Sequence, residues 1–195
     1  MTKKNYLPVY TLSEELINSI SHGVGTCLSI AALVLCIVQA AVNGTAAGVV
    51  SACIYGVSLT MLYIMSTLYH AITNRTARKV FRVFDHTSIF FLIAGTYTPI
   101  TLVTLGGALG WTLFGLVWGA AIVGIVLNAV SIEKFKKFSM ICYICMGWAA
   151  LIGIKTIYER LPGNGFTFLL LGGVFYTVGI VFYALKKYKY MHCVW

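Results

Sequence analysis

Charged residues are scarce in this chain of 195 residues. Only 10% of the residues are Asp, Glu, Lys or Arg, whereas 59% are hydrophobic, and the mean hydropathy is +0.89. A soluble domain of this size does not need so much apolar surface, so the composition excludes the ordinary soluble classes. Segments of alternating polarity, which a membrane β-barrel requires, are also missing. The composition therefore predicts an all-α polytopic membrane protein.

Low-complexity stretches are missing as well, and the connections between apolar runs are short. We therefore expect one membrane domain covering residues 1–195. Six runs come close to the roughly 20 residues that span a bilayer core: 16–42, 48–69, 87–105, 111–130, 138–154 and 166–185. Pro99 lies inside the third run and predicts a kink there, because it removes a backbone donor. After the sixth run, residues 190–195 resemble the first turn of a seventh helix that is truncated.

Basic residues give the chain a formal net charge of +9, and they gather in alternate loops. One set comprises Lys3, Lys4, Arg75, Arg78, Lys79, Arg82, Lys134, Lys136, Lys137, Lys186, Lys187 and Lys189. Only Lys155 and Arg160 fall in the opposite loops. By the positive-inside rule, this asymmetry predicts a multi-pass plasma-membrane protein with a cytoplasmic N-terminus. The membrane topology, together with some attraction to anionic lipids, explains the excess of basic residues. We therefore expect no nucleic-acid partner.

Polar and ionisable side chains collect at the predicted cytoplasmic edge of several runs. Such groups are costly in lipid and are rarely without function. The cluster consists of Glu15, Asn18 and His22 on one face of the first run, Ser66 and His70 at the end of the second, Asp85 at the start of the third, and His192 in the seventh segment. Because the orientation was derived from Lys and Arg alone, this convergence is an independent indication of a site.

The residue types in this cluster favour a metal site. Two or three imidazoles with a carboxylate are the usual ligands of a zinc ion with an open position. Zinc in such a site lowers the pKa of bound water to about 7 and polarises a carbonyl. Asp85 would then serve as the base, and Ser66 as a donor behind the metal or to an oxyanion. At a membrane edge, the expected substrate is a lipid amide or ester.

Each residue also has a plainer interpretation. His70 can be an interfacial residue, Asp85 the N-cap of the third helix, and Ser66 a donor to its own backbone. Glu15 either titrates at the interface or pairs with a nearby arginine. His86 is turned roughly 100° from Asp85 around the helix and is expected to face the headgroups. The co-location of the set, rather than any single residue, carries the site hypothesis.

Four ordered motifs resemble the bacterial hemolysin III proteins, which belong to the progestin and adiponectin receptor superfamily and are grouped with the alkaline ceramidases. The motifs are Glu15-x-x-Asn18-x-x-x-His22, Ser66-x-x-x-His70, Asp85-His86-Thr87-Ser88 and Ala94-Gly95-Thr96-Tyr97-Thr98-Pro99. The resemblance covers essentially the whole chain. It implies seven helices in a bacterial inner membrane, with the N-terminus in the cytoplasm.

The resemblance also implies a ligand set. By position, His70 would be the first zinc ligand, His192 the second, and Asp85 a carboxylate linked to the metal through water. The family's last histidine would be residue 196, one past Trp195, so we expect a native protein that is longer or a site that holds zinc weakly. His22, His86 or Asp85 could supply the missing ligand.

Three functional hypotheses follow. The first is a metal-dependent hydrolase of a membrane lipid. The second is a non-enzymatic membrane-homeostasis factor or cytolysin, although a cytolysin is usually amphipathic before insertion. A receptor or transporter ranks third, because the outer loops are short and the ionisable residues lie at one edge rather than near mid-membrane. The substrate and the oligomeric state do not follow from the sequence.

Overall fold

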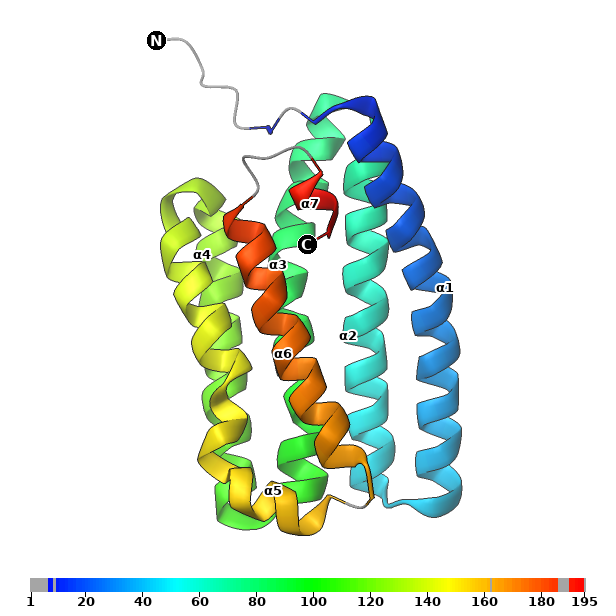
Figure 1. Cartoon of the computed structure of the whole chain (residues 1–195), viewed down its shortest axis with the longest axis vertical. Helices are drawn as coiled ribbons and strands as arrows, with labels where there is room; N and C mark the ends of the chain where they lie inside the picture. Colours follow the sequence, from blue (N-terminus) through cyan, green and yellow to red (C-terminus); the bar gives the residue numbers. More distant parts are fainter. Residues whose placement is uncertain (1–6, 9, 162, 186–189, 195) are drawn as a thin grey trace.

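A computed structural model describes residues 7–8, 10–161, 163–185 and 190–194 of the chain. These residues form helices joined by short turns, with no strand among them, and the long helices run side by side (Figure 1). The predicted all-α class is therefore confirmed. Within the described part of the chain, five helices are long and apolar enough to cross a membrane. Of the basic residues used for topology, Lys3, Lys4, Lys186, Lys187 and Lys189 lie outside the described residues.

The first two helices, α1 (Leu12–Asn43) and α2 (Ala46–Ala71), form an antiparallel pair. Thr11 and Glu14 make a capping box at the start of α1, in which the Glu14 carboxylate accepts a hydrogen bond from the Thr11 backbone amide at 2.9 Å. Thr45 caps α2 through the amide of Gly48. Both helices begin earlier than the apolar runs suggested, because caps rather than hydrophobicity decide where a helix starts.

The third helix, α3 (Arg75–Pro99), begins ten residues before Asp85, where the Asn74 side chain caps it. The prediction that Asp85 opens this helix is wrong, and so is its interpretation as an N-cap. The error arose because the basic first turns of α3 were counted as loop. At Pro99 the expected departure from α-helix occurs: the chain continues as the π-helix η1 (Ile100–Leu105).

The next helix, α4 (Gly107–Gly147), is a hairpin rather than one straight rod. Its backbone leaves helical geometry at Ser131 (φ −166°, ψ 104°). Ser139 donates a 2.7 Å hydrogen bond to Asn128, eleven residues away. Eleven residues of straight helix would separate the two by about 16 Å, so the chain must reverse direction between them. The predicted runs 111–130 and 138–154 therefore correspond to the two limbs of α4, with the basic residues at the tip.

The remaining helices complete the bundle. The second limb of α4 ends in a 3-10 turn, η2 (Ala149–Gly153), and a short helix, α5 (Ile154–Arg160), so the fifth predicted run is only partly α-helical. The long helix α6 (Gly165–Ala184) matches the sixth run closely. The short helix α7 (Met191–Val194) occupies the place of the seventh. The structure confirms neither a full seventh helix nor a seven-helix count.

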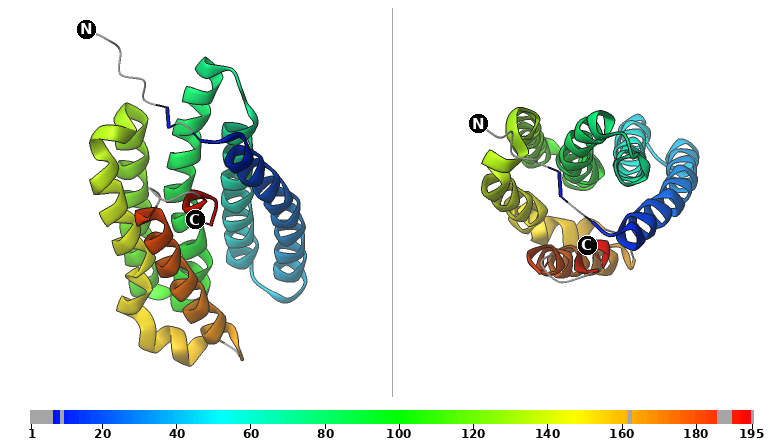
Figure 2. Two further views of the ribbon diagram at one scale, coloured as in Figure 1. Left: turned by 45° about the horizontal axis from the view of Figure 1, so that its top comes forward. Right: turned by 90° about the horizontal axis from the view of Figure 1, so that it is seen from above.

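Seen from above, the helices form a ring in chain order (Figure 2). Each of the pairs α1–α2, α2–α3 and α3–α4 is in contact, and the main buried cluster lies between α3 and α4, around Phe90 and Tyr143. By contrast, Leu28, Leu35 and Val42 on α1 are more than half exposed. Seven-residue spacing places these side chains on one stripe of the helix, which suits contact with lipid.

Candidate functional site

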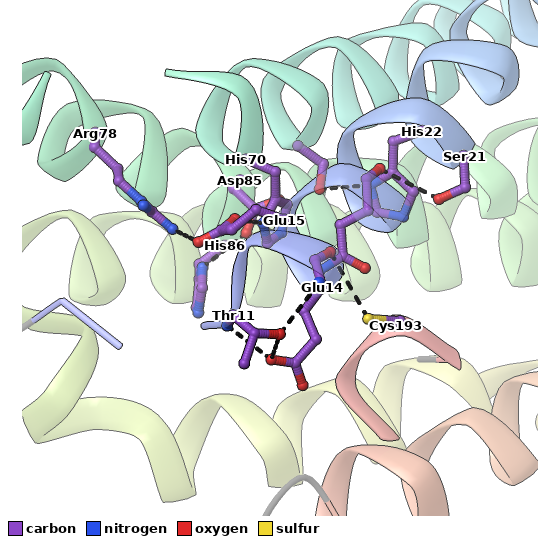
Figure 3. A network of polar contacts seen from close by, with 12 residues as sticks. Thr11, Glu14, Glu15, Ser21, His22, His70, Arg78, Asp85, His86 and Cys193 are labelled. Atoms are coloured by element: carbon purple, nitrogen blue, oxygen red, sulfur yellow. Dashed lines mark hydrogen bonds and ion pairs between the residues drawn. The ribbon is translucent and has the colours of Figure 1, made fainter. Parts of the chain in front are cut away.

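Most of the predicted polar cluster is brought together at one end of the bundle, where α1 begins and α2 ends (Figures 1 and 3). Glu15 and His22 come from α1, Ser66 and His70 from α2, and Asp85 from the interior of α3. Ser66 is 3% exposed and His70 is 7% exposed. These side chains are thus enclosed by protein although they lie near the end of the helices.

Glu15 links the histidine of α2 to an arginine of α3. Its Oε2 lies 2.6 Å from Nδ1 of His70, and its Oε1 pairs with Arg78 (Figure 3). The pairing with an arginine confirms one of the two interpretations of Glu15. A carboxylate only accepts hydrogen bonds, so Nδ1 of His70 carries the proton and a neutral ring keeps its lone pair on Nε2. Metal-binding histidines are commonly oriented by a carboxylate in this way.

Ser66 lies beside the other histidine of the cluster. Its Oγ lies 2.6 Å from Nδ1 of His22. A hydroxyl can donate or accept, so this contact suits either tautomer of His22. When His22 donates from Nδ1, the lone pair of the neutral ring is on Nε2. The Ser66 hydroxyl thus contacts a side chain of α1, in contrast to the backbone interpretation considered above.

The donor chemistry of this cluster fits a zinc ion only in part. The ring centroids of His22 and His70 lie 6.4 Å apart. Two imidazoles on one tetrahedral zinc, with Zn–N distances of about 2.0–2.1 Å, would place them ~5 Å apart, so the rings would have to approach by about 1 Å. In the part of the chain that the structure describes, no group of three or more His, Cys, Asp or Glu side chains is arranged as a metal site.

The third predicted histidine, His192, lies on α7, and its side chain is outside the described residues. The backbone around it is held at the site. The amide of Tyr190 donates to Oε1 of Glu14 at 3.2 Å, and the Cys193 thiol donates to the Glu14 carbonyl at 3.8 Å (Figure 3). Glu14 was not among the predicted site residues, but it joins α7 to the beginning of α1.

Asn18 is 2% exposed, and its side-chain nitrogen has no hydrogen-bond partner among the described residues. An unsatisfied buried donor of this kind costs about 1–3 kcal/mol, so a native structure keeps it only for a reason. It lies one turn from both Glu14 and His22 on the inner face of α1. The predicted sharing of one helix face by Asn18 and His22 is consistent with this burial.

Besides Glu14, sequence reasoning missed or misplaced three residues. Arg78 was counted only as a topology charge, whereas it pairs with Glu15. His86 was expected to face the headgroups, but its Nδ1 lies 3.1 Å from Oδ2 of Asp85. This contact bridges the roughly 100° between neighbouring helical residues, and 26% of the His86 side chain remains exposed. The adjacency of Asp85 and His86 was the available signal.

The third missed residue is Tyr10, which precedes α1 and lies over the cluster, with its ring centroid 5.9 Å from that of His70. Burial raises the pKa of Tyr10 to about 12, against the opposing effect of the Arg82 charge. The phenol therefore stays protonated at neutral pH and remains a hydrogen-bond donor.

Comparison with known proteins identifies the family. A family sequence model described as "Haemolysin-III related" matches residues 10–195. Hemolysin-3 of Bacillus cereus is 45% identical over 195 residues, which is all of this chain and 89% of that protein. The Hemolysin-3 homolog of Bacillus subtilis (strain 168) is 44% identical over 187 residues, covering 96% of this chain and 88% of that protein. The human monocyte to macrophage differentiation factor is 27% identical over 152 residues, which cover 75% of this chain and 63% of that protein.

No solved structure matches the chain. The family match and the two Bacillus relatives agree with the family that the sequence motifs indicated. The chain is a membrane protein that belongs to the haemolysin-III related family, within the progestin and adiponectin receptor superfamily.

Proposed function

We propose that this protein is a zinc-dependent hydrolase that cleaves an amide or ester bond of a membrane lipid. The main support is the 2.6 Å contact between the Glu15 carboxylate and Nδ1 of His70. This contact leaves the Nε2 lone pair of a buried imidazole available to bind a metal ion. His70 and His192 would hold the metal, with His22 as the substitute that the geometry offers. When bound, zinc would polarise the substrate carbonyl and favour the ionisation of water.

The protein's own side chains have separable roles in this proposal. Asp85 accepts a proton from the attacking water and returns it to the departing amine or alcohol as the carbon–nitrogen or carbon–oxygen bond breaks. Ser66 orients His22 through the contact between its hydroxyl and Nδ1. The side-chain nitrogen of Asn18, which has no partner among the described residues, is suited to donate a hydrogen bond to the carbonyl oxygen of the lipid.

The site is proposed to face the cytoplasm across a bacterial inner membrane. Arg75, Arg78, Lys79 and Arg82 lie in the first turns of α3, and the Lys134–Lys137 stretch lies at the tip of the α4 hairpin, at the same end of the bundle as the cluster (Figure 1). At the other end, α5 carries Lys155 and Arg160. This distribution supports a cytoplasmic N-terminus by the positive-inside rule.

The test uses purified protein in lipid nanodiscs, with zinc measured by mass spectrometry and lipid cleavage by the release of fatty acid. His70→Ala should lose both zinc and turnover. Asp85→Asn should retain most zinc but lose turnover, because the carboxylate acts on the proton rather than as a direct ligand. Glu159→Gln, an exposed carboxylate change on α5, is the matched control and should alter neither. Undiminished cleavage by His70→Ala would sink the proposal.

A second candidate function, cytolysis, is supported by the name Hemolysin-3 of the two Bacillus relatives. It competes with a membrane-homeostasis role that needs no catalysis. Lysis of erythrocytes by the pure protein at low concentration without detergent would favour the cytolysin. Intact erythrocytes combined with no zinc in any sample would leave the homeostasis role.

A further inference from the structure

A cavity of about 60 Å³ lies against α3 and both limbs of α4, and Tyr10 before α1 and Tyr183 of α6 also line it. A single water needs about 10–15 Å³, so the cavity has room for several waters or for one small polyatomic group. Arg82 and His86 line it from α3, and Glu133 and Lys136 line it from α4. Nothing in the proposed hydrolytic chemistry uses this space.

The charges around the cavity favour an anion. Arg82 and Lys136 supply two cations, and Glu133 supplies one carboxylate, which is ion-paired with Arg82. The side chains of this pair differ in exposure: Arg82 is 11% exposed and Glu133 is 45% exposed. A half-exposed carboxylate can turn into water at little cost, whereas the buried guanidinium needs an anionic partner in place. The pair is thus arranged for exchange of the carboxylate by another anion.

Neutral donors complete the lining. Tyr10 contributes a phenol that stays protonated at neutral pH. Asn128 contributes an amide group, whose oxygen already accepts from Ser139. A phosphate group presents several acceptor oxygens and matches the fork of an arginine bidentately.

We propose that this cavity binds a phosphate group, carried by an anionic phospholipid or free in solution, with Arg82 and Lys136 as its cationic partners and Glu133 as the group it displaces. This inference rests on the proposed function and extends it, because it identifies the lipid substrate as a phospholipid. Phosphate binding is measured without lipid turnover, so the phosphate site and the hydrolase mechanism can be refuted separately.

The experiment measures saturable binding to the Asp85→Asn protein, which cannot turn over in the proposed mechanism. One arm adds phosphatidylglycerol to protein in neutral detergent and counts bound lipid by native mass spectrometry. The other arm adds inorganic phosphate and follows thermal stabilisation. Arg82→Gln should weaken binding about tenfold or more, because a charge-assisted contact is lost. Glu133→Gln should strengthen binding, because the competing carboxylate is gone.

Lys134→Gln is the matched control for Lys136→Gln, because both lysines lie at the hairpin tip but only Lys136 lines the cavity. Weaker binding by Lys136→Gln alone supports the site. Equal losses in the two variants would overturn it, since diffuse attraction to a basic surface predicts that result. Saturable binding of phosphatidylglycerol assigns the phosphate group to a lipid. Saturable binding of inorganic phosphate alone assigns it to a free anion. The absence of binding in both arms refutes the proposal. If binding follows this pattern while His70→Ala still cleaves lipid, the hydrolase mechanism fails and the phosphate site stands.

Discussion

Replacing Glu15 by Gln should weaken zinc binding while the bundle stays folded. The substitution keeps the shape of the side chain, and its amide oxygen still accepts from Nδ1 of His70. A neutral acceptor is only about half as strong as a carboxylate, however, so the ring is held less firmly. Changing the outer partner of a metal-binding histidine typically costs about 10–100-fold in affinity. We expect a loss in that range, measured by competition with a chromophoric zinc chelator.

The stability of Glu15→Gln should change less. The side chain of Glu15 is 12% exposed and that of Arg78 is 19% exposed, which lies between a surface pair and a fully buried one. A loss of about 1–2 kcal/mol in unfolding free energy follows, below the roughly 3–5 kcal/mol of a buried pair. Thermal unfolding in detergent provides this measurement, and Glu159→Gln is the control. Equal zinc affinity in Glu15→Gln and the parent, or an absence of zinc in both, would refute the reasoning.

Three further outcomes are expected. Asn128→Ala should lower the unfolding free energy by about 1–3 kcal/mol, because it strands the buried hydroxyl of Ser139; thermal unfolding of both single variants and the double variant checks this coupling. Asn18→Ala should leave the midpoint of unfolding unchanged or higher, since its amide has no partner among the described residues, while KM for lipid rises. A fluorescent protein that folds only in the cytoplasm should fluoresce when fused before α1, and a dark fusion would invert the proposed topology.

The apolar runs predicted most of the fold, because a long uncharged segment by itself indicates a membrane-spanning helix. The positions of α1, α2 and α6 follow from it within a few residues. The start of α3 did not, because its first turns are basic and only the Asn74 cap marks them. The reversal in α4 falls where a loop was predicted, between residues 130 and 138. The backbone leaves helical geometry there only at Ser131, however, and the rest of that stretch is helical, which no hydropathy pattern reveals.

The site was predictable as a set of residues but not as a network. Their positions at the ends of apolar runs, together with the topology derived from Lys and Arg, indicated that His22 and His70 would approach the same end of the bundle. Which nitrogen each ring presents depends on contacts across helices, from Glu15 to His70 and from Ser66 to His22. Such contacts depend on helix rotation and rotamers, which a single sequence does not encode visibly. Their roles as metal ligands remain predictions.

The two proposals meet on α3, and their combination sets a requirement for the substrate. Arg82 and Asp85 are three residues apart, so they share a face of the helix and differ by about 4.5 Å along its axis. In a glycerophospholipid, the ester carbonyls lie only a few bonds from the phosphate, so a phosphate held by Arg82 brings a carbonyl near Asp85. Phosphatidylglycerol should therefore be cleaved faster than diacylglycerol, which has the same esters without the phosphate. Arg82→Gln should remove this preference while leaving diacylglycerol cleavage unchanged, because the reacting groups themselves are intact. Equal preference in the parent and in Arg82→Gln would separate the cavity from the reaction.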